Sequence, residues 1–231
     1  MRNPAFTGNA VHDDTPATLH EPALKHHFDD LGQQHEAATL GMWLFLATEV
    51  LFFGGLFAAY MLYRVWYPET WGAASRTLDV TLGATNTFVL ITSSLTMALA
   101  VHAAATDKRR TLLIFLVLTM VLGAVFLGIK GLEYAHKFEE HHVPGLGFHF
   151  EGTAPERANL FFSLYFAMTG LHAAHMVIGL VLMAVMCWMA ARGRFSSRWY
   201  TPVEISGLYW HFVDIVWIFL FPLLYLVDRH Q

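Results

Sequence analysis

Five apolar stretches, each long enough to cross a bilayer, alternate with shorter polar segments along the chain. A helix of about 20 apolar residues spans the hydrocarbon core of a membrane. The pattern therefore predicts an all-α, polytopic membrane protein, a bundle of five transmembrane helices, over residues 39–231, preceded by a polar cytoplasmic N-terminal tail at residues 1–38. The predicted spans cover about residues 40–63, 80–104, 111–129, 160–191 and 203–227.

Composition agrees with a membrane location. Of the 231 residues, 55% are hydrophobic and only 14% are charged, which lies outside the range of soluble globular domains. The formal net charge of −4 is too small to indicate a nucleic-acid partner. The single cysteine, Cys187, lies inside an apolar stretch and is predicted to be an inert buried thiol.

Charge in the loops predicts the orientation of the bundle. The loop between the second and third spans and the loop between the fourth and fifth are basic, whereas the long segment from His136 to Arg157 is acidic. Cytoplasmic loops carry an excess of lysine and arginine. We therefore expect the N-terminus, which lies on the same side as both basic loops, to be cytoplasmic and the C-terminus to be outside.

Several ionisable residues interrupt the apolar stretches. An ionised carboxylate at the centre of a bilayer costs about 2.5–3.5 kcal/mol, so these side chains should point into the bundle rather than into lipid. Helical spacing places Glu204, His211 and Asp214 on one stripe of the fifth span, and His172 and His175 on one face of the fourth. Together with the residue at the middle of the first span, they predict a buried polar cluster: Glu49, His172, His175, Glu204, His211 and Asp214.

The second span is rich in small polar residues. Such residues let membrane helices approach closely and exchange hydrogen bonds, which predicts a central position for this helix in the bundle. The residues expected to pack in this way are Asn86, Ser93, Ser94 and His102.

Residue types alone leave three interpretations of the buried cluster open. His172, His175 and His211 could ligate a haem or a metal. Glu49, His175 and Asp214 could form the proton relay of a stand-alone membrane carrier. The groups could also only fix helix register through hydrogen bonds. We expect no metal site and no redox cofactor in this chain, because the three histidines should be engaged by Glu49, Glu204 and Asp214. His175 is the predicted partner of Glu49.

Five motifs occur in the order found in one membrane-protein family. The segment Trp43–Gly54 resembles the glutamate-bearing helix of subunit III of haem-copper terminal oxidases, the cytochrome c oxidase subunit 3 family, and Thr169–Gly179 resembles its two-histidine helix. The other motifs that match are Asn86-Thr87 with Ser93-Ser94 and Val101–Ala103, Leu132–Tyr134, and Tyr209–Trp217 with Glu204 before it.

This resemblance implies a function within a respiratory electron-transport chain. Subunit III holds no haem or copper, is not an enzyme by itself, binds phospholipid, packs with subunits I and II, and supports proton uptake while oxygen is reduced and protons are pumped. The family's carbodiimide-reactive carboxylate would be Glu49, and the location would be a bacterial cytoplasmic (inner) membrane. A further small helical subunit or a respiratory supercomplex would be additional partners. Within the family, the alternative identity is the related protein that accompanies nitric oxide reductases.

The chain differs from the longer family form because it lacks two helices before the one that carries Glu49. It is similar to the five-helix bacterial form. In the long form a lipid-filled cleft lies against the two absent helices, so the resemblance predicts that a cleft here needs a wall from another subunit.

Overall fold

The described part of the chain forms six helices, five of them long and apolar enough to cross a membrane. The computed structural model describes residue 24 and residues 28–145, 147–150 and 154–227, so most of the predicted N-terminal tail lies outside the described residues. The prediction of an all-α bundle with five transmembrane helices is confirmed. The helices are α1 (Leu31–Trp66), α2 (Pro68–Arg76), α3 (Val80–Ala105), α4 (Arg109–Glu139), α5 (Pro155–Ala191) and α6 (Thr201–Tyr225).

Helix boundaries follow local capping chemistry. The side chain of Asp30 accepts a hydrogen bond from the backbone N–H of Gln33, and Asp79 accepts from the N–H groups of Thr81 and Leu82. These contacts satisfy donors that the first turn of a helix leaves free. As a result α1 begins at Leu31, well before the apolar stretch itself. Helix α4 also exceeds its predicted span, because it continues to Glu139.

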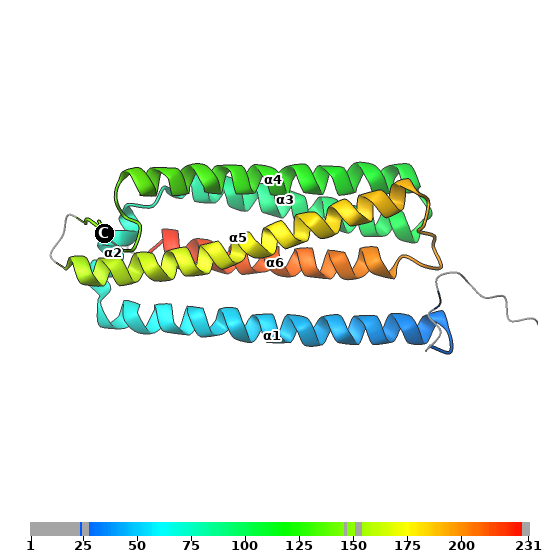
Figure 1. Ribbon diagram of the computed structural model, residues 1–231, viewed down its shortest axis with the longest axis horizontal. Coiled ribbons are helices and arrows are strands. Elements are labelled where there is room, and N and C mark those ends of the chain that lie inside the picture. The colour runs from blue at the N-terminus through cyan, green and yellow to red at the C-terminus, as the bar shows by residue number, and fades with distance from the viewer. Residues whose placement is uncertain (1–23, 25–27, 146, 151–153, 228–231) are drawn as a thin grey trace, which may run out of the picture.

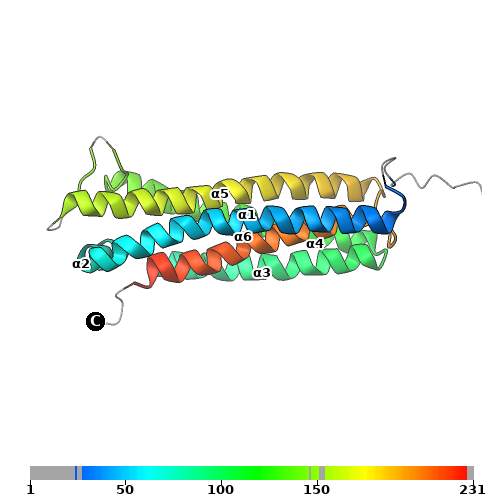
Figure 2. The same cartoon turned by 90° about the horizontal axis from the view of Figure 1, so that it is seen from below.

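Four helices form a closed bundle and the fifth long helix lies outside it. Helix α6 packs against α3 and α5, and α4 closes the ring by packing against the same two helices. Helix α1 contacts α5 and α6 from one side. In Figure 1 it lies on the side of the molecule opposite α3 and α4, and in Figure 2, which is seen from below, it lies in front of the bundle. The central helix is therefore α6 rather than α3, contrary to the expectation drawn from the small polar residues of α3.

One tryptophan of α6 sets the spacing of this bundle. The ring of Trp210 lies between Gly123 of α4 and Gly179 of α5, where an added Cβ would come within 2.7 and 2.8 Å of ring atoms. The indole N–H donates to the hydroxyl of Ser93 on α3, with a nitrogen–oxygen distance of 2.9 Å. A single buried side chain thus contacts the other three helices of the four-helix bundle, and two glycines make room for it.

The segment between the first two spans contains a short helix, α2. Pro68 occupies the first turn of α2, a position that tolerates the missing N–H. The ring of Trp71 is completely buried against Phe161, with 5.6 Å between ring centroids. Ser75 donates a hydrogen bond to the carbonyl of Leu224. Helix α2 therefore covers one end of the bundle.

The two ends of the bundle are closed by polar contacts of the loops. At the end where α1 begins, Arg109 donates to the carbonyls of Ala190 and Ala191, and hydrogen bonds from Ser197 lower the pKa of Asp107. At the opposite end, His142 stacks on Phe162 with 4.9 Å between ring centroids, and burial lowers the pKa of this histidine. Each loop is thereby fixed to the helices beside it.

Candidate functional site

Glu49 of α1 and His175 of α5 form a hydrogen-bonded pair between the outer helix and the bundle. The distance from Glu49 Oε2 to His175 Nε2 is 3.2 Å, and their side chains are 18% and 12% exposed. The ring of Phe53 lies 5.5 Å from the imidazole, and the Tyr209 hydroxyl donates to the backbone carbonyl of His175. The predicted pairing of Glu49 with His175 is confirmed.

The second ring nitrogen of His175, Nδ1, shows how many protons the pair holds. Nδ1 is 2.9 Å from the carbonyl oxygen of Leu171, which can only accept, so Nδ1 carries a hydrogen. A hydrogen bond between Nε2 and Glu49 then requires one further proton, held either by the carboxyl or by the imidazole. The pair is thus a two-residue unit that stores one proton in an apolar environment.

His211 and Asp214 of α6 belong to a different group. The Nδ1 atom of His211 lies 2.7 Å from the hydroxyl of Ser94 on α3. The carboxyl of Asp214 is 3% exposed and lines the same pocket as Ser94 and His211. Ser94 faces this carboxyl, but neither carboxyl oxygen meets hydrogen-bond geometry with any described residue.

The remaining residues of the predicted cluster lie apart from these two groups. Glu204 is at the beginning of α6, where its Oε2 atom is 3.8 Å from Nδ1 of His35. His172 is buried between the rings of Phe126 and Trp217, and neither of its nitrogens has a hydrogen-bond partner among the described residues. Of the three intramembrane histidines, only His175 therefore pairs with an acidic side chain as expected.

The predicted packing residues of α3 differ in their surroundings. Ser93 and Asn86 are fully buried, and Ser93 accepts the hydrogen bond from Trp210 described above. Ser94 is hydrogen-bonded to His211. His102 is exposed in the last turn of α3. The described residues contain no group of three or more His, Cys, Asp or Glu side chains arranged to hold a metal ion.

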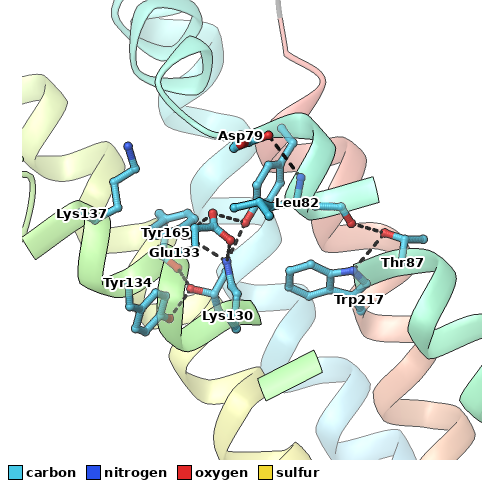
Figure 3. Close-up of polar contacts among 12 residues, drawn as sticks. Asp79, Leu82, Thr87, Lys130, Glu133, Tyr134, Lys137, Tyr165 and Trp217 are labelled. Carbon is cyan, nitrogen blue, oxygen red and sulfur yellow. Dashed lines mark hydrogen bonds and ion pairs between the residues drawn. The ribbon is translucent and has the colours of Figure 1, made fainter. Parts of the chain in front are cut away.

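A third buried polar group was not predicted. Lys130 and Glu133 of α4 are each 3% exposed, and Lys130 Nζ lies 3.0 Å from Glu133 Oε2. Lys130 donates to the hydroxyls of Tyr165 and Tyr225, and both hydroxyls donate to Glu133 Oε1 (Figure 3). Every partner is provided within α4, α5 and α6, so this network holds three helices together.

A signal for this network was present in the sequence. Lys130 and Glu133 are three residues apart, which places them on one face of a helix. Both residues lie just beyond the predicted third span, which ends near residue 129, whereas α4 continues for a further ten residues to Glu139.

Comparison with known proteins assigns the chain to a family. The family model described as "Cytochrome c oxidase subunit III" matches residues 26–228. The chain belongs to this family. It is 34% identical to a cytochrome c oxidase subunit 3 of Thermostichus vulcanus over 87% of this chain and 92% of that protein. It is 30% identical to a probable quinol oxidase subunit 3 of Staphylococcus epidermidis over 86% of this chain and 93% of that protein.

Family membership indicates the kind of complex to which this chain belongs. Subunit III proteins are components of oxidase complexes, so the subunits with which this chain would assemble are those of a cytochrome c oxidase or a quinol oxidase. The resemblance inferred from the five motifs is thereby confirmed, and the chain is a multi-pass membrane protein with helices of spanning length.

Proposed function

We propose that this chain is the non-catalytic subunit III of a haem-copper respiratory oxidase, in which it stabilises subunit I and supports sustained proton uptake. It binds no haem or copper itself; those groups belong to the partner subunits I and II. We place the complex in a bacterial cytoplasmic membrane, with the N-terminus of this chain cytoplasmic and the C-terminus periplasmic, because the basic loops lie at the end where α1 begins.

The isolated Glu49–His175 pair is the observation that best supports this accessory role. No hydrogen bond among the described residues connects it to Ser94, His211 or Asp214. A proton relay through Glu49, His175 and Asp214 would need such a connection or a water-filled path. A pair that stores one proton at the edge of a bundle fits a subunit that acts beside the catalytic chain better than it fits a stand-alone carrier.

Co-purification tests the proposal directly. We expect a tagged form of this chain to bring down a larger haem-bearing subunit from native membranes, and we expect the separated chain to show no stoichiometric haem absorption. Proton or solute transport by the purified single chain in vesicles would favour the carrier instead. Capture of a nitric oxide reductase rather than an oxygen-reducing enzyme would favour the related accessory protein.

Substitution of Glu49 by glutamine should leave the initial rate of oxygen consumption within about a factor of two of the unmodified complex. The reason is geometric, since the amide N–H of glutamine can donate to Nε2 of His175 where a carboxyl O–H would. Removal of the whole subunit should instead give a complex that starts at a substantial rate and then loses activity progressively during turnover. The measurement is an oxygen-electrode time course with haem content determined in parallel.

Glu49→Leu is the matched control for this experiment, because leucine keeps the volume of the side chain but cannot donate to His175. An immediate and complete loss of the initial rate in Glu49→Gln, with the haems still in place, would show that the carboxylate takes part in the chemistry. The assignment as an accessory subunit would then be wrong.

Phospholipid binding is part of the same proposal, and a groove between α1 and α6 supports it. The groove has a volume of about 460 Å³ and is lined on α1 by residues from Trp43 to Phe57 and on α6 by residues from Leu208 to Phe219. The α1 wall is about 21 Å long at 1.5 Å per residue, which exceeds the half-thickness of a hydrocarbon core. Its walls are apolar except for His211. Both walls come from this chain, so the groove itself does not depend on another subunit.

Gly54 offers a test of lipid in this groove. Gly54 lines the groove and Gly55 does not, although an added Cβ meets no atom within 4 Å at either position. We expect Gly54→Leu to reduce the phospholipid that remains with the purified complex by about one molecule per subunit, and Gly55→Leu to leave it unchanged. Lipid extraction followed by quantitative mass spectrometry measures the difference, and equal lipid content in the two variants would contradict the proposal.

A further inference from the structure

Five exposed cations gather where α4 begins and α5 ends. We call them the basic rim: Lys108, Arg109, Arg110, Arg192 and Arg194. The two helix ends lie side by side, because Arg109 Nε donates to the carbonyl of Ala190 at a distance of 2.8 Å. Asp107 is the only acidic residue in the two loops that carry the rim, and its Oδ1 atom accepts the backbone N–H of Ser197. This end of the α4–α5 pair is therefore strongly positive.

Two arginines of the basic rim are held in fixed positions. Arg109 donates hydrogen bonds to the carbonyls of Ala190 and Ala191, the last two residues of α5. The guanidinium of Arg192 lies over the ring of Trp188, with 3.9 Å between its central carbon and the ring centroid. Carbonyls and aromatic rings position a guanidinium without cancelling its charge. An anion that binds here therefore meets charges that are already in place.

The basic rim has no counter-ion in the part of the chain that the structure describes. None of its five side chains forms an ion pair with a described carboxylate. Arginine forms paired hydrogen bonds with phosphate oxygens, and several of its N–H groups remain when one contact is made. Fixed guanidinium groups without a carboxylate partner favour a ligand that carries a phosphate.

Exposed apolar side chains continue from the basic rim along α4 and α5. Helical spacing places Ile114 on the same face of α4 as Arg110, and Val185 on the same face of α5 as Trp188 and Arg192. These apolar side chains are 65%, 45% and 50% exposed for Ile114, Val185 and Trp188. Tryptophan is enriched at the membrane–water interface. The rim therefore lies at the level of lipid headgroups, and the apolar side chains lie at the level of acyl chains.

We propose that the basic rim binds the phosphate of an anionic phospholipid whose acyl chains lie along the exposed apolar faces of α4 and α5. Basic side chains that directly adjoin transmembrane helices attract anionic lipids. Phosphatidylglycerol has no cationic group, whereas the ammonium of phosphatidylethanolamine would be repelled by the rim. The site shares no residue with the groove between α1 and α6. It goes beyond the proposed function, because that groove has apolar walls and does not select a headgroup charge.

Photo-crosslinking in the intact complex tests this selection. The complex is reconstituted with equal amounts of phosphatidylglycerol and phosphatidylethanolamine, and p-benzoylphenylalanine replaces Val185 or Ile114 next to the rim. In the control it replaces Val177, which is 50% exposed on α5 and lies about 12 Å further from the rim than Val185. Mass spectrometry of the lipid adducts should show phosphatidylglycerol about threefold more often than phosphatidylethanolamine beside the rim, and both lipids equally at Val177.

Charge substitutions show whether the rim causes the selection. Arg110→Gln combined with Arg192→Gln should return the adducts at Val185 to equal proportions. The matched control is Arg64→Gln combined with Arg76→Gln, which removes the same charge from the last turns of α1 and α2 at the other end of the molecule. This control should keep the threefold preference. Inorganic phosphate added at constant ionic strength should also leave the preference unchanged, because a soluble anion lacks the acyl chains that hold the lipid in place.

Four results would overturn the inference. Equal proportions of the two lipids beside the rim and at Val177 would remove the selection, and a preference that survives the double substitution at Arg110 and Arg192 would assign it to other groups. Loss of the preference in inorganic phosphate would assign the rim to a soluble anion. Adducts with protein instead of lipid would assign this face to another subunit. Each result leaves co-purification with a haem-bearing chain untouched, so the proposed function is tested separately.

Discussion

Substitution of Glu133 by leucine is expected to lower the free energy of unfolding of this subunit by about 3–5 kcal/mol, the cost of leaving a buried charge without its partner. Lys130 would keep its two tyrosine hydroxyls but lose its counter-ion at 3.0 Å. The hydroxyls of Tyr165 and Tyr225 would also lose their acceptor, Glu133 Oε1. The measurement is denaturant- or heat-induced unfolding of the subunit in detergent, followed by helix content.

The double variant Lys130→Met with Glu133→Leu is the matched control. It removes both charges and leaves two apolar side chains of similar length, so a large part of the lost stability should return. If the double variant were as unstable as Glu133→Leu alone, the loss would come from packing and the two tyrosine hydroxyls rather than from an unpaired lysine.

Substitution of Gly179 or Gly123 by alanine is expected to destabilise the bundle by about 1–3 kcal/mol each, because the new methyl group meets the ring of Trp210. The added Cβ would come within 2.8 Å of ring atoms at Gly179 and 2.7 Å at Gly123. Trp210 cannot move away without breaking its hydrogen bond to Ser93. Thermal unfolding measures the effect on stability, and tryptophan fluorescence reports the displacement of the ring.

Gly128→Ala provides the comparison on the same helix as Gly123. An added Cβ at Gly128 meets no atom within 4 Å, and alanine is favoured over glycine in a helix by about 0.5–1 kcal/mol. This variant should therefore be neutral or slightly stabilising. A loss of stability at Gly128 equal to that at Gly123 would show that helix flexibility, rather than contact with Trp210, is what the glycines provide.

The five spans could be predicted from the sequence because the length of an apolar run is set by the thickness of a bilayer. Helix α2 could not, since proline and glycine both favour turns, whereas Pro68 here occupies the first turn of a helix, which proline also tolerates. The burial of Trp71 against Phe161 of α5 decides between the two. That contact joins residues far apart in the sequence and leaves no local pattern.

The pairing of Glu49 with His175 could be predicted because the two lie at similar depth on helices that must both turn polar groups inward. The way in which the six predicted polar residues divide into separate groups could not be predicted. Helical spacing gives the face on which a residue lies, but not the neighbour that this face meets. Asp214 shares a stripe with His211, and in the structure that stripe faces the seam with α3 rather than His175.

The position of α1 outside the four-helix bundle has a consequence for biosynthesis. Its helix neighbours within the bundle are α5 and α6, which are made well after it, and Glu49 precedes His175 by 126 residues. At about 5–20 residues per second, translation separates the two side chains by roughly 6–25 s. During this interval Glu49 enters the membrane without its imidazole. Helix α1 thus waits in the membrane for the helices against which it packs, and until they arrive its carboxyl must be neutral or shielded by the insertion machinery.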